Sequence, residues 1–576
     1  MSPSRRRVWL ALILVVGATL RAYRIDWGLP DFVFLDTYLF VSRPAWQLLV
    51  HGDWLPEKMI HPPALAYLVA GGTLAWTKLT GASVPPATDL SLFDLVGRIL
   101  TVLFSTATIA ALYALARRSI GTYGALIAAA ALALTPVHVL EAHRPHTDAL
   151  MILVSLLAAH QALVARDEGS TARLLVSFAL IGLAGGVKYT GLAAGSLQAW
   201  IALTWDGRSW SARFALLLSG CAVVLAAFLV VILPILVQWD ELVRTGKVIF
   251  SAGMVTGAPG ENLQGEGWVF VRYVYPLVVA LPFVMGWTIY LSGLAGLLLV
   301  ARAPRVRGPV LAAVVPFFLL QGAAQTVTPR YFLPLVPWLC LGCGYAMAQL
   351  RQRRPPLGLA TTLVVLGYTA ILTVSHCLRI QDGPQRAAAS AIQAEVERVR
   401  ADGRELRLAY PVRLQLAYDT LKPLLGPDVD LVFFPIGWGR RASDDPHDRS
   451  GRFARWLDEE NVDAVLVTSW REGIARRGGL SRADAAFLDR LDDGSLGFEL
   501  ALDTRTRFFT QDLYTWADPV FETFVPAGIM GYELYVRRRD SRLEGLPAAA
   551  GRSSPEPAAA PLRTPRAASR RSERGR

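Results

Sequence analysis

The sequence predicts an all-α polytopic membrane bundle of about 11 spans, followed by an α/β domain outside the cytoplasm. Of the 576 residues, 53% are hydrophobic and 18% are charged, and the mean hydropathy is +0.37. A soluble domain cannot bury that much apolar surface. The apolar residues are gathered in runs of about 20, the length that crosses a hydrocarbon core. After residue 376 the chain becomes richer in charge, which indicates a second domain.

The predicted spans follow these apolar runs. They begin near Val8, Asp94, Gly121, Thr147, Arg173, Tyr189, Ser211, Tyr275, Gly308, Tyr331 and Pro356. The first run follows three arginines and has no small-residue cleavage site before Arg21, so we expect a retained anchor rather than a signal peptide. The apolar stretch 61–78 begins with His61 and two prolines, and we expect it to pack at the outer surface without crossing.

The arginines between spans predict the orientation. They fall in every second loop, and by the positive-inside rule those loops face the cytoplasm. The chain is therefore predicted to be a multi-pass protein of the plasma (inner) membrane with a cytoplasmic N-terminus. Residues 22–93, 141–147, 238–274 and 326–330, and everything after residue 376, are then outside the cytoplasm. The concentrated polar chemistry lies on that side.

The net charge of +12, with a pI near 9.7, reflects this topology together with a basic tail, and it does not indicate nucleic-acid binding. Three of the four cysteines, Cys221, Cys340 and Cys343, lie inside predicted spans, where they serve most simply as small apolar residues.

Three regions follow from the composition. Residues 1–376 form the transmembrane domain, with an outer loop at 22–93, and residues 377–540 form the extracytoplasmic α/β domain. Within the latter, strands are predicted at 462–467 and 532–536 and helices at 385–401 and 451–460. Residues 541–576 are rich in Pro, Ala, Ser and Arg and are expected to be disordered.

Four outward-facing motifs carry a family resemblance. The first is Phe34-Leu35-Asp36-Thr37-Tyr38, followed by Gly52-Asp53-Trp54 and by His61-Pro62-Pro63-Ala64-Leu65-Ala66-Tyr67-Leu68. The others are His143-Arg144-Pro145-His146-Thr147-Asp148-Ala149-Leu150, Gly186-Val187-Lys188-Tyr189-Thr190-Gly191-Leu192 and Arg330-Tyr331-Phe332-Leu333-Pro334-Leu335-Val336-Pro337. In order and side, they resemble the protein O-mannosyltransferase and lipid A aminoarabinose transferase family. These are membrane glycosyltransferases of the C type, which use polyprenyl-phosphate sugars. The resemblance covers residues 8–376.

The resemblance implies an enzyme of the cell envelope, a hexosyl- or pentosyltransferase. It would move a sugar from a membrane lipid, a polyprenyl-phosphate donor, to an extracytoplasmic acceptor that is a protein, a lipid or a glycan. Two positions depart from the family pattern. The usual Asp-Glu of the first loop is Asp36-Thr37 here, and the Lys that commonly precedes Pro-Pro in the aminoarabinose branch is His61.

Asp36 is the predicted catalytic base. A polyprenyl phosphate is a good leaving group, so one carboxylate that takes the acceptor's proton is sufficient, and the pair of carboxyls of a glycosidase is not needed. Asp148 is the second catalytic candidate, because its counterpart in the family lies near the reaction centre. The alternative is that Thr147 or Asp148 caps a helix N-terminus.

The leaving phosphate requires cations at the outer face. Arg330 is the first choice, since a guanidinium can bind phosphate oxygens bidentately, with an interfacial anchor as its alternative role. Lys188 interrupts an apolar stretch, where a charge is usually functional or faces a cavity. His61, Arg272 and Tyr331 complete the predicted substrate-binding set.

No cofactor is predicted with certainty. Glu141, His143 and His146 have the composition of a divalent metal site, although interfacial histidines without a metal are commoner. Two functions from other classes stay open: a transporter or flippase of lipid-linked sugars, and a catalytically silent assembly subunit. A transporter should carry ionisable residues at mid-membrane on several helices, whereas here they cluster in outer loops.

Overall fold

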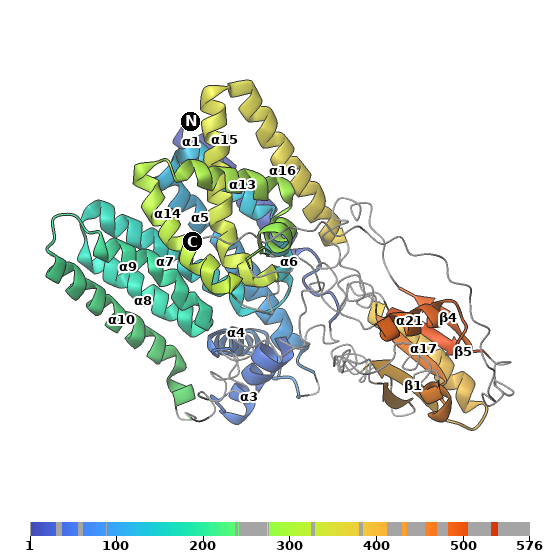
Figure 1. Ribbon diagram of the computed structural model, residues 1–576. Coiled ribbons are helices and arrows are strands. Elements are labelled where there is room, and N and C mark those ends of the chain that lie inside the picture. The colour runs from blue at the N-terminus through green and yellow to red at the C-terminus, as the bar shows by residue number, and fades with distance from the viewer. Residues whose placement is uncertain are drawn as a thin grey trace, which may run out of the picture. The chain divides into compact units, whose positions relative to one another are not determined.

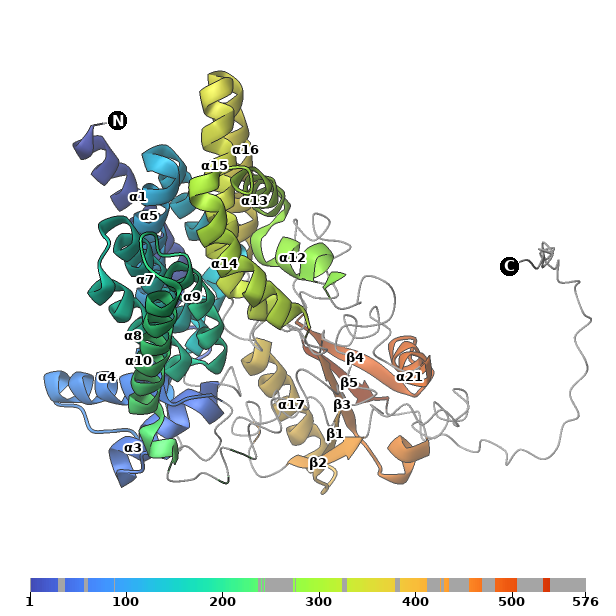
Figure 2. The ribbon, with the colours of Figure 1, turned by 60° about the vertical axis from the view of Figure 1, so that its left-hand side comes forward.

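The computed structural model describes residues 2–29, 37–55, 61–87, 89–236, 240, 243, 273–274, 276–323, 329–378, 384–411, 425, 429–434, 455–468, 482–504 and 532–538. Up to residue 378 these are almost all helical (Figures 1 and 2). The α-helices there are α1 (Pro3–Ala22), α3 (Arg43–His51), α4 (Ala64–Thr80), α5 (Ser91–Ala133), α6 (Pro136–Leu140), α7 (Thr147–Glu168), α8 (Thr171–Val187), α9 (Ser196–Leu203), α10 (Trp210–Leu236), α12 (Leu281–Met285), α13 (Trp287–Val300), α14 (Pro304–Gly322), α15 (Val336–Arg353) and α16 (Pro355–Leu378). Shorter 3₁₀ and π segments are η1 (Tyr38–Ser42), η2 (Glu141–His143), η3 (Tyr189–Gly195), η6 (Pro276–Ala280) and η7 (Pro329–Leu335).

The predicted helical bundle is confirmed, and the number of crossings stays a prediction. Every predicted span start lies on a helical segment except Tyr275, which is outside the described residues. Among those residues, five helices are long and apolar enough to cross a bilayer, or six if the bent pair Pro276–Met285 and Trp287–Val300 is one span. Two further apolar helices, Thr171–Val187 and Val306–Gly322, are shorter.

Gly121 separates two predicted spans within α5. Its φ of 77° and ψ of 173° are not helical, and glycine adopts this conformation without the steric cost that a Cβ would bring. The apolar runs that begin near Asp94 and Gly121 therefore meet at a kink rather than at a loop.

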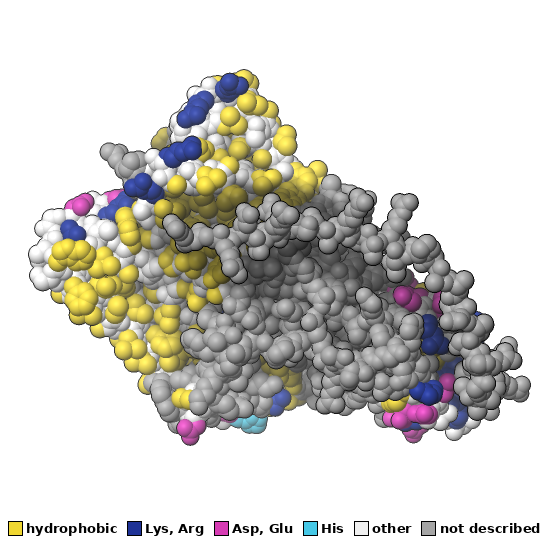
Figure 3. Space-filling model, in the orientation of Figure 1, with side chains coloured by type: hydrophobic (Ala, Val, Ile, Leu, Met, Phe, Trp, Pro, Cys, Tyr) yellow, Lys and Arg dark blue, Asp and Glu magenta, His cyan; other side chains and the backbone are white. Residues whose placement is uncertain are grey.

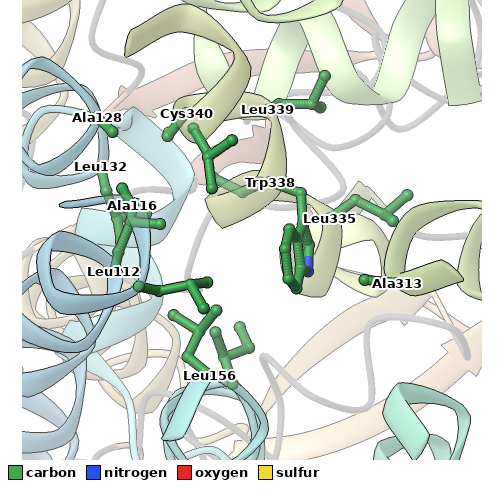
Figure 4. Close-up of a cluster of buried hydrophobic side chains, with 14 of the residues drawn as sticks. Leu112, Ala116, Ala128, Leu132, Leu156, Ala313, Leu335, Trp338, Leu339 and Cys340 are labelled. Carbon is green, nitrogen blue, oxygen red and sulfur yellow. The ribbon is translucent and has the colours of Figure 1, made fainter. Parts of the chain in front are cut away.

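The core of the bundle forms where α5, α7 and α15 meet. Figure 4 shows side chains of α5, α7 and α15 facing one another, with the Trp338 ring lying between Leu335 and the rest of the cluster. Close backbone approaches tighten this core, because a Cβ on Gly296 of α13 would collide with the carbonyl oxygen of Gly342 in α15. Small residues thus let helices pack closely where lipid provides no hydrophobic driving force.

The outer surface of the bundle is apolar on its sides. Large hydrophobic side chains of α10 are exposed, namely Trp210, Phe214, Leu218, Leu225, Val230 and Leu233. Figure 3 shows such side chains covering this side of the bundle, with Lys and Arg gathered at the end where α15 joins α16. This is the distribution that the positive-inside rule predicts for a cytoplasmic end.

The region after residue 383 contains a small mixed sheet. Its strands are β1 (Leu406–Pro411), β2 (Val429–Phe434), β3 (Ala464–Thr468), β4 (Phe498–Asp503) and β5 (Tyr532–Arg537), in the order β2-β1-β3-β5-β4. β1 pairs in parallel with β2 and β3, whereas β5 is antiparallel to both β3 and β4. The two predicted strands are confirmed within two residues, and the helix predicted at 385–401 is α17 (Pro384–Arg400).

Alternation along the strands divides the core of the sheet between two faces. Leu406 and Leu408 of β1 pack with α17, whereas Ala409 packs on the opposite face with α21 (Arg482–Asp492). Successive side chains of a strand point to opposite faces, so one strand supplies both layers. This region is a small α/β fold with a helix on each face, as the sequence predicts; its boundaries at 377 and 540 remain predictions.

The glycine contact between α13 and α15 predicts a position-specific effect. Gly296→Ala should destabilise the protein by about 1–3 kcal/mol, because the new methyl group must displace the α15 backbone. Gly367→Ala in α16 is the matched control, since no atom lies within 4 Å of the position that its Cβ would occupy. Thermal unfolding in detergent should show a lower Tm for Gly296→Ala only. Equal Tm values for the two variants would contradict the close packing.

Candidate active site

A buried ion pair joins the outer ends of α7 and α8. Asp148 lies in the first turn of α7 and is 2% exposed, while Lys188 follows the last residue of α8 and is 7% exposed. Lys188 Nζ donates a hydrogen bond to Asp148 Oδ1 at 2.7 Å. Neither Thr147 nor Asp148 caps α7, because the N-cap residue is His146 and no side-chain cap bond is present there. The capping alternative for Asp148 is therefore wrong.

Two histidines extend this pair. His146 Nδ1 lies 2.6 Å from Asp148 Oδ2, with the ring turned away from an ideal hydrogen-bond alignment. The His146 ring contacts the His61 ring edge-on at 5.5 Å between centroids, and the His61 ring in turn contacts Phe40 at 5.1 Å. The His-Pro-Pro motif is thereby brought against the motif that contains Asp148, although 84 residues separate His61 from Pro145.

Tyr331 connects two cations of the site. Lys188 Nζ lies 5.4 Å from the centroid of the Tyr331 ring, and the guanidinium carbon of Arg330 lies 5.8 Å from the same centroid. Both residues come from the motif at the start of η7. Four predicted substrate-binding residues, His61, Lys188, Arg330 and Tyr331, thus lie together around Asp148.

Electrostatics keep the two histidines neutral. Burial lowers the pKa of His146 to about 4, against the raising effect of Asp148, and Arg330 lowers it further. Burial also lowers the pKa of His61 well below its usual range, and the neighbouring His146, Lys188 and Arg330 lower it as well. The positive charge of the site at neutral pH is therefore carried by Lys188 and Arg330.

Buried contacts fix the start of the outer loop. Arg98 of α5 is fully buried, forms an ion pair with Asp94 at 2.6 Å, and donates to the carbonyl oxygens of Ile25 and Trp27 at 2.9 and 2.6 Å. His143 Nε2 lies 2.9 Å from the carbonyl oxygen of Tyr23. These groups hold the turn that leads from α1 into the loop.

The loop is fixed again where the described chain resumes. Thr37 is 1% exposed, and its hydroxyl donates to the carbonyl oxygen of Pro145 at 3.3 Å. Pro145 packs on Gly97 of α5, where a Cβ would lie 2.7 Å from the proline ring. Thr37, which replaces the family's usual Glu, thus has a structural contact beside His146. Asp36 itself and Arg272 lie outside the described residues.

The three metal candidates have other contacts. Glu141 forms a two-point ion pair with Arg144, whose Nε donates to Oε2 at 2.7 Å. His143 Nδ1 lies 3.0 Å from the carbonyl oxygen of Val139, so both of its ring nitrogens face carbonyls. Within the described part of the chain, no group of three or more His, Cys, Asp or Glu side chains could hold a metal ion. The structure does not bring Glu141, His143 and His146 together as ligands.

Sequence reasoning missed the charged groups that support the site. Arg21 is fully buried and donates to Ser105 Oγ, to the carbonyl oxygens of Leu132 and Ala133, and to His138 Nδ1. Those carbonyls belong to the C-terminal end of α5, where unpaired carbonyls attract a cation. The available signal was a charge within or at the end of an apolar run, which is costly unless it is paired.

His143 predicts that stability depends on pH. Burial lowers its pKa to about 4, so the unfolded chain binds a proton more readily than the folded protein between pH 6.5 and 4. The stability is complete above pH 6.5 and is lost as the pH falls towards 4, by roughly 2 kcal/mol at pH 5 for one such histidine. His143→Gln keeps a donor for the Tyr23 carbonyl but cannot titrate. Its Tm should fall less than that of the wild type between pH 7.5 and 5; parallel falls would contradict the assignment.

Comparisons with known proteins agree with this architecture. The family model of dolichyl-phosphate-mannose-protein mannosyltransferases matches residues 90–233, which contain the Asp148 and Lys188 motifs. No curated protein has a matching sequence.

Three solved structures are similar. ArnT from Cupriavidus metallidurans in the apo state is 15% identical, with a TM-score of 0.50 over 92% of this chain and 98% of ArnT. The Archaeoglobus fulgidus oligosaccharyltransferase in the apo form is 13% identical, with a TM-score of 0.48 over 84% of this chain and 71% of the enzyme. The Saccharomyces cerevisiae Pmt1-Pmt2 complex bound to the sugar donor is 17% identical, with a TM-score of 0.33 over 42% and 35%. The predicted resemblance to the C-type glycosyltransferases of the protein O-mannosyltransferase and ArnT family is confirmed.

Proposed function

We propose that this protein is a membrane glycosyltransferase that moves a hexosyl or pentosyl group from a polyprenyl-phosphate donor to an extracytoplasmic acceptor. One observation carries the proposal: two cations, Lys188 and Arg330, share the Tyr331 ring beside the buried Asp148. A lipid-linked phosphate is the substrate whose leaving group such a pair would bind. The family model that matches residues 90–233 is itself named for a dolichyl-phosphate donor.

The two cations have different tasks. Lys188 is fixed by its bond to Asp148, so it presents a localised charge to the phosphate. Arg330 can bind two phosphate oxygens through its planar fork. Asp148 is then a positioning residue rather than a base, because its Oδ1 accepts from Lys188 and its Oδ2 lies against His146.

Asp36 is the proposed base. It is bonded directly to Thr37, whose hydroxyl contacts the residue before His146, and this supports a role beside the cations. The acceptor's oxygen or nitrogen would attack the anomeric carbon from the face opposite the phosphate, which inverts that centre. The bond between the sugar and the phosphate oxygen breaks, the phosphate leaves with the electron pair, and the acceptor's proton passes to Asp36.

We propose that the C-terminal α/β region, outside the cytoplasm by the odd span count, positions the acceptor. Three tryptophans predicted as sugar-facing surface, Trp438, Trp470 and Trp516, lie outside the described residues. The transporter alternative is less well supported, because the charges of the site lie at the ends of helices: Asp148 in the first turn of α7 and Lys188 after the last residue of α8.

The base assignment predicts that Asp36→Asn abolishes transfer, by on the order of 10²-fold or more, because it removes the proton acceptor and changes almost no volume. Transfer is measured with defined polyprenyl-phosphate sugars in reconstituted membranes. Asp89→Asn is the matched control: this carboxylate belongs to the same predicted outer loop, is exposed and accepts only from the Ser91 amide among its printed contacts. Wild-type turnover by Asp36→Asn would exclude it as the base. Movement of the lipid-linked sugar without a new glycosidic bond would favour the transporter.

The phosphate contact predicts that Arg330→Lys lowers kcat/KM for the donor by about 10-fold, because Lys keeps the charge and loses the planar fork. Arg302→Lys, at an exposed arginine between α13 and α14, should leave donor use unchanged. If Arg330→Lys retains full donor use, Arg330 is an interfacial anchor and another cation binds the phosphate.

A further inference from the structure

A small cavity lies behind the Asp148–His146 pair. It is lined by residues of α5, α6, η2, α7 and η7, among them Ser105, His138, Glu141, Ala142, His146 and Asp148. About 10 Å³ is open to the centre of a water molecule, which is close to the least space that one water needs. The cavity is distinct from the phosphate side of the site, where Lys188, Arg330 and Tyr331 meet.

Three buried polar atoms belong to residues that line this cavity. His138 Nε2 and His146 Nε2 have no hydrogen-bond partner among the described residues, and Asp148 Oδ2 has only its poorly aligned contact with His146. Each of these side chains is at most 4% exposed. A buried polar atom without a partner costs about 1–3 kcal/mol, so three around one cavity indicate a shared polar ligand.

The contacts of His138 determine where its proton is. Arg21 Nη2 lies 2.9 Å from His138 Nδ1, and an arginine can only donate, so Nδ1 accepts and the proton is on Nε2. Ser105 Oγ lies 3.1 Å from the same Nδ1. Burial and the charge of Arg21 lower the pKa of His138 well below its usual range, which agrees with a neutral ring. His138 therefore presents an N–H donor that no described residue accepts.

We propose that this cavity binds one structural water, which accepts from His138 Nε2 and donates to Asp148 Oδ2 or His146 Nε2, and that His138 is thereby a positioning residue for the active site. This proposal rests on the proposed function in one respect: the group that is positioned is Asp148, which holds Lys188. A water with two to four polar partners can fill such a site, and an ordered water of this kind is part of the structure.

The bridge would connect the two buried charge systems of the protein. On one side, Arg21 joins the end of α1 to the end of α5 and fixes the His138 ring. On the other, Asp148 joins α7 to the end of α8. With the water in place, the orientation of the Asp148 carboxylate, and hence of Lys188, depends on His138 although the two do not touch.

Two substitutions of His138 separate its two nitrogens. His138→Asn keeps an acceptor near the position of Nδ1 for Arg21 and Ser105 but withdraws the donor from the cavity. His138→Gln supplies an N–H near the position of Nε2 but withdraws the acceptor from Arg21. We expect His138→Asn to lower kcat about 5- to 10-fold with a Tm near that of the wild type. His138→Gln should recover most of that kcat while lowering the Tm.

Ala142→Val provides a test that leaves every polar group in place. The added methyl groups would fill the cavity, so kcat should fall as in His138→Asn. If both variants act through one water, their effects do not multiply, and the double variant should have the kcat of either single variant. Multiplied effects, or a kcat that follows the Tm across all variants, would overturn the proposal and leave His138 as a packing residue.

The water itself is tested independently of activity. A structure of the full-length protein at a resolution that shows ordered waters should reveal one peak between His138 Nε2 and Asp148 in the wild type, and none in Ala142→Val. An empty cavity, or a side chain of the protein in that place, would refute the inference. Should the wild type show the water but transfer no sugar, the proposed function fails and the water site stands.

Discussion

The structure depends on one constraint: a charge inside a low-dielectric bundle must have a fixed partner. The Asp148–Lys188 pair meets it directly, with an Nζ to Oδ1 distance of 2.7 Å between two almost fully buried side chains. Removing one member of such a pair typically costs about 3–5 kcal/mol, because it leaves the other charge buried alone. The pair therefore ties the outer end of α7 to the outer end of α8, and the active-site cations are built on that tie.

The same constraint explains how the outer loop is anchored. Arg98 has a carboxylate partner in Asp94 and uses its remaining donors on carbonyl oxygens at the start of the loop. Arg21 instead binds the carbonyls at the end of α5, where the helix dipole supplies the negative charge. Each buried arginine holds a chain segment that no regular secondary structure would hold. The loop that contains Asp36 thus begins from a turn fixed by α5 and η2.

The sequence predicts which residues meet at the site but not how they are supported. His61, Asp148, Lys188, Arg330 and Tyr331 are recognisable because charged and aromatic residues are conspicuous beside apolar runs. The contacts of Arg98 and His143 are with backbone carbonyls, which carry no sequence signal, so they could not be predicted. Span counting is ambiguous for a related reason. A buried apolar helix such as α8 or α14 and a short spanning helix have the same composition, and only packing and length distinguish them.

Irregular backbone concentrates at the site, and the membrane explains why. Three 3₁₀ segments, η2, η3 and η7, follow or precede the site residues His146, Lys188 and Tyr331. Non-helical backbone at membrane depth is tolerated only where it is buried in protein or lines a polar cavity. A C-type enzyme needs such breaks, because a continuous helix would direct its side chains along one stripe and could not converge five motifs on one phosphate. The helices supply a rigid, glycine-packed frame, and their broken outer ends supply the chemistry.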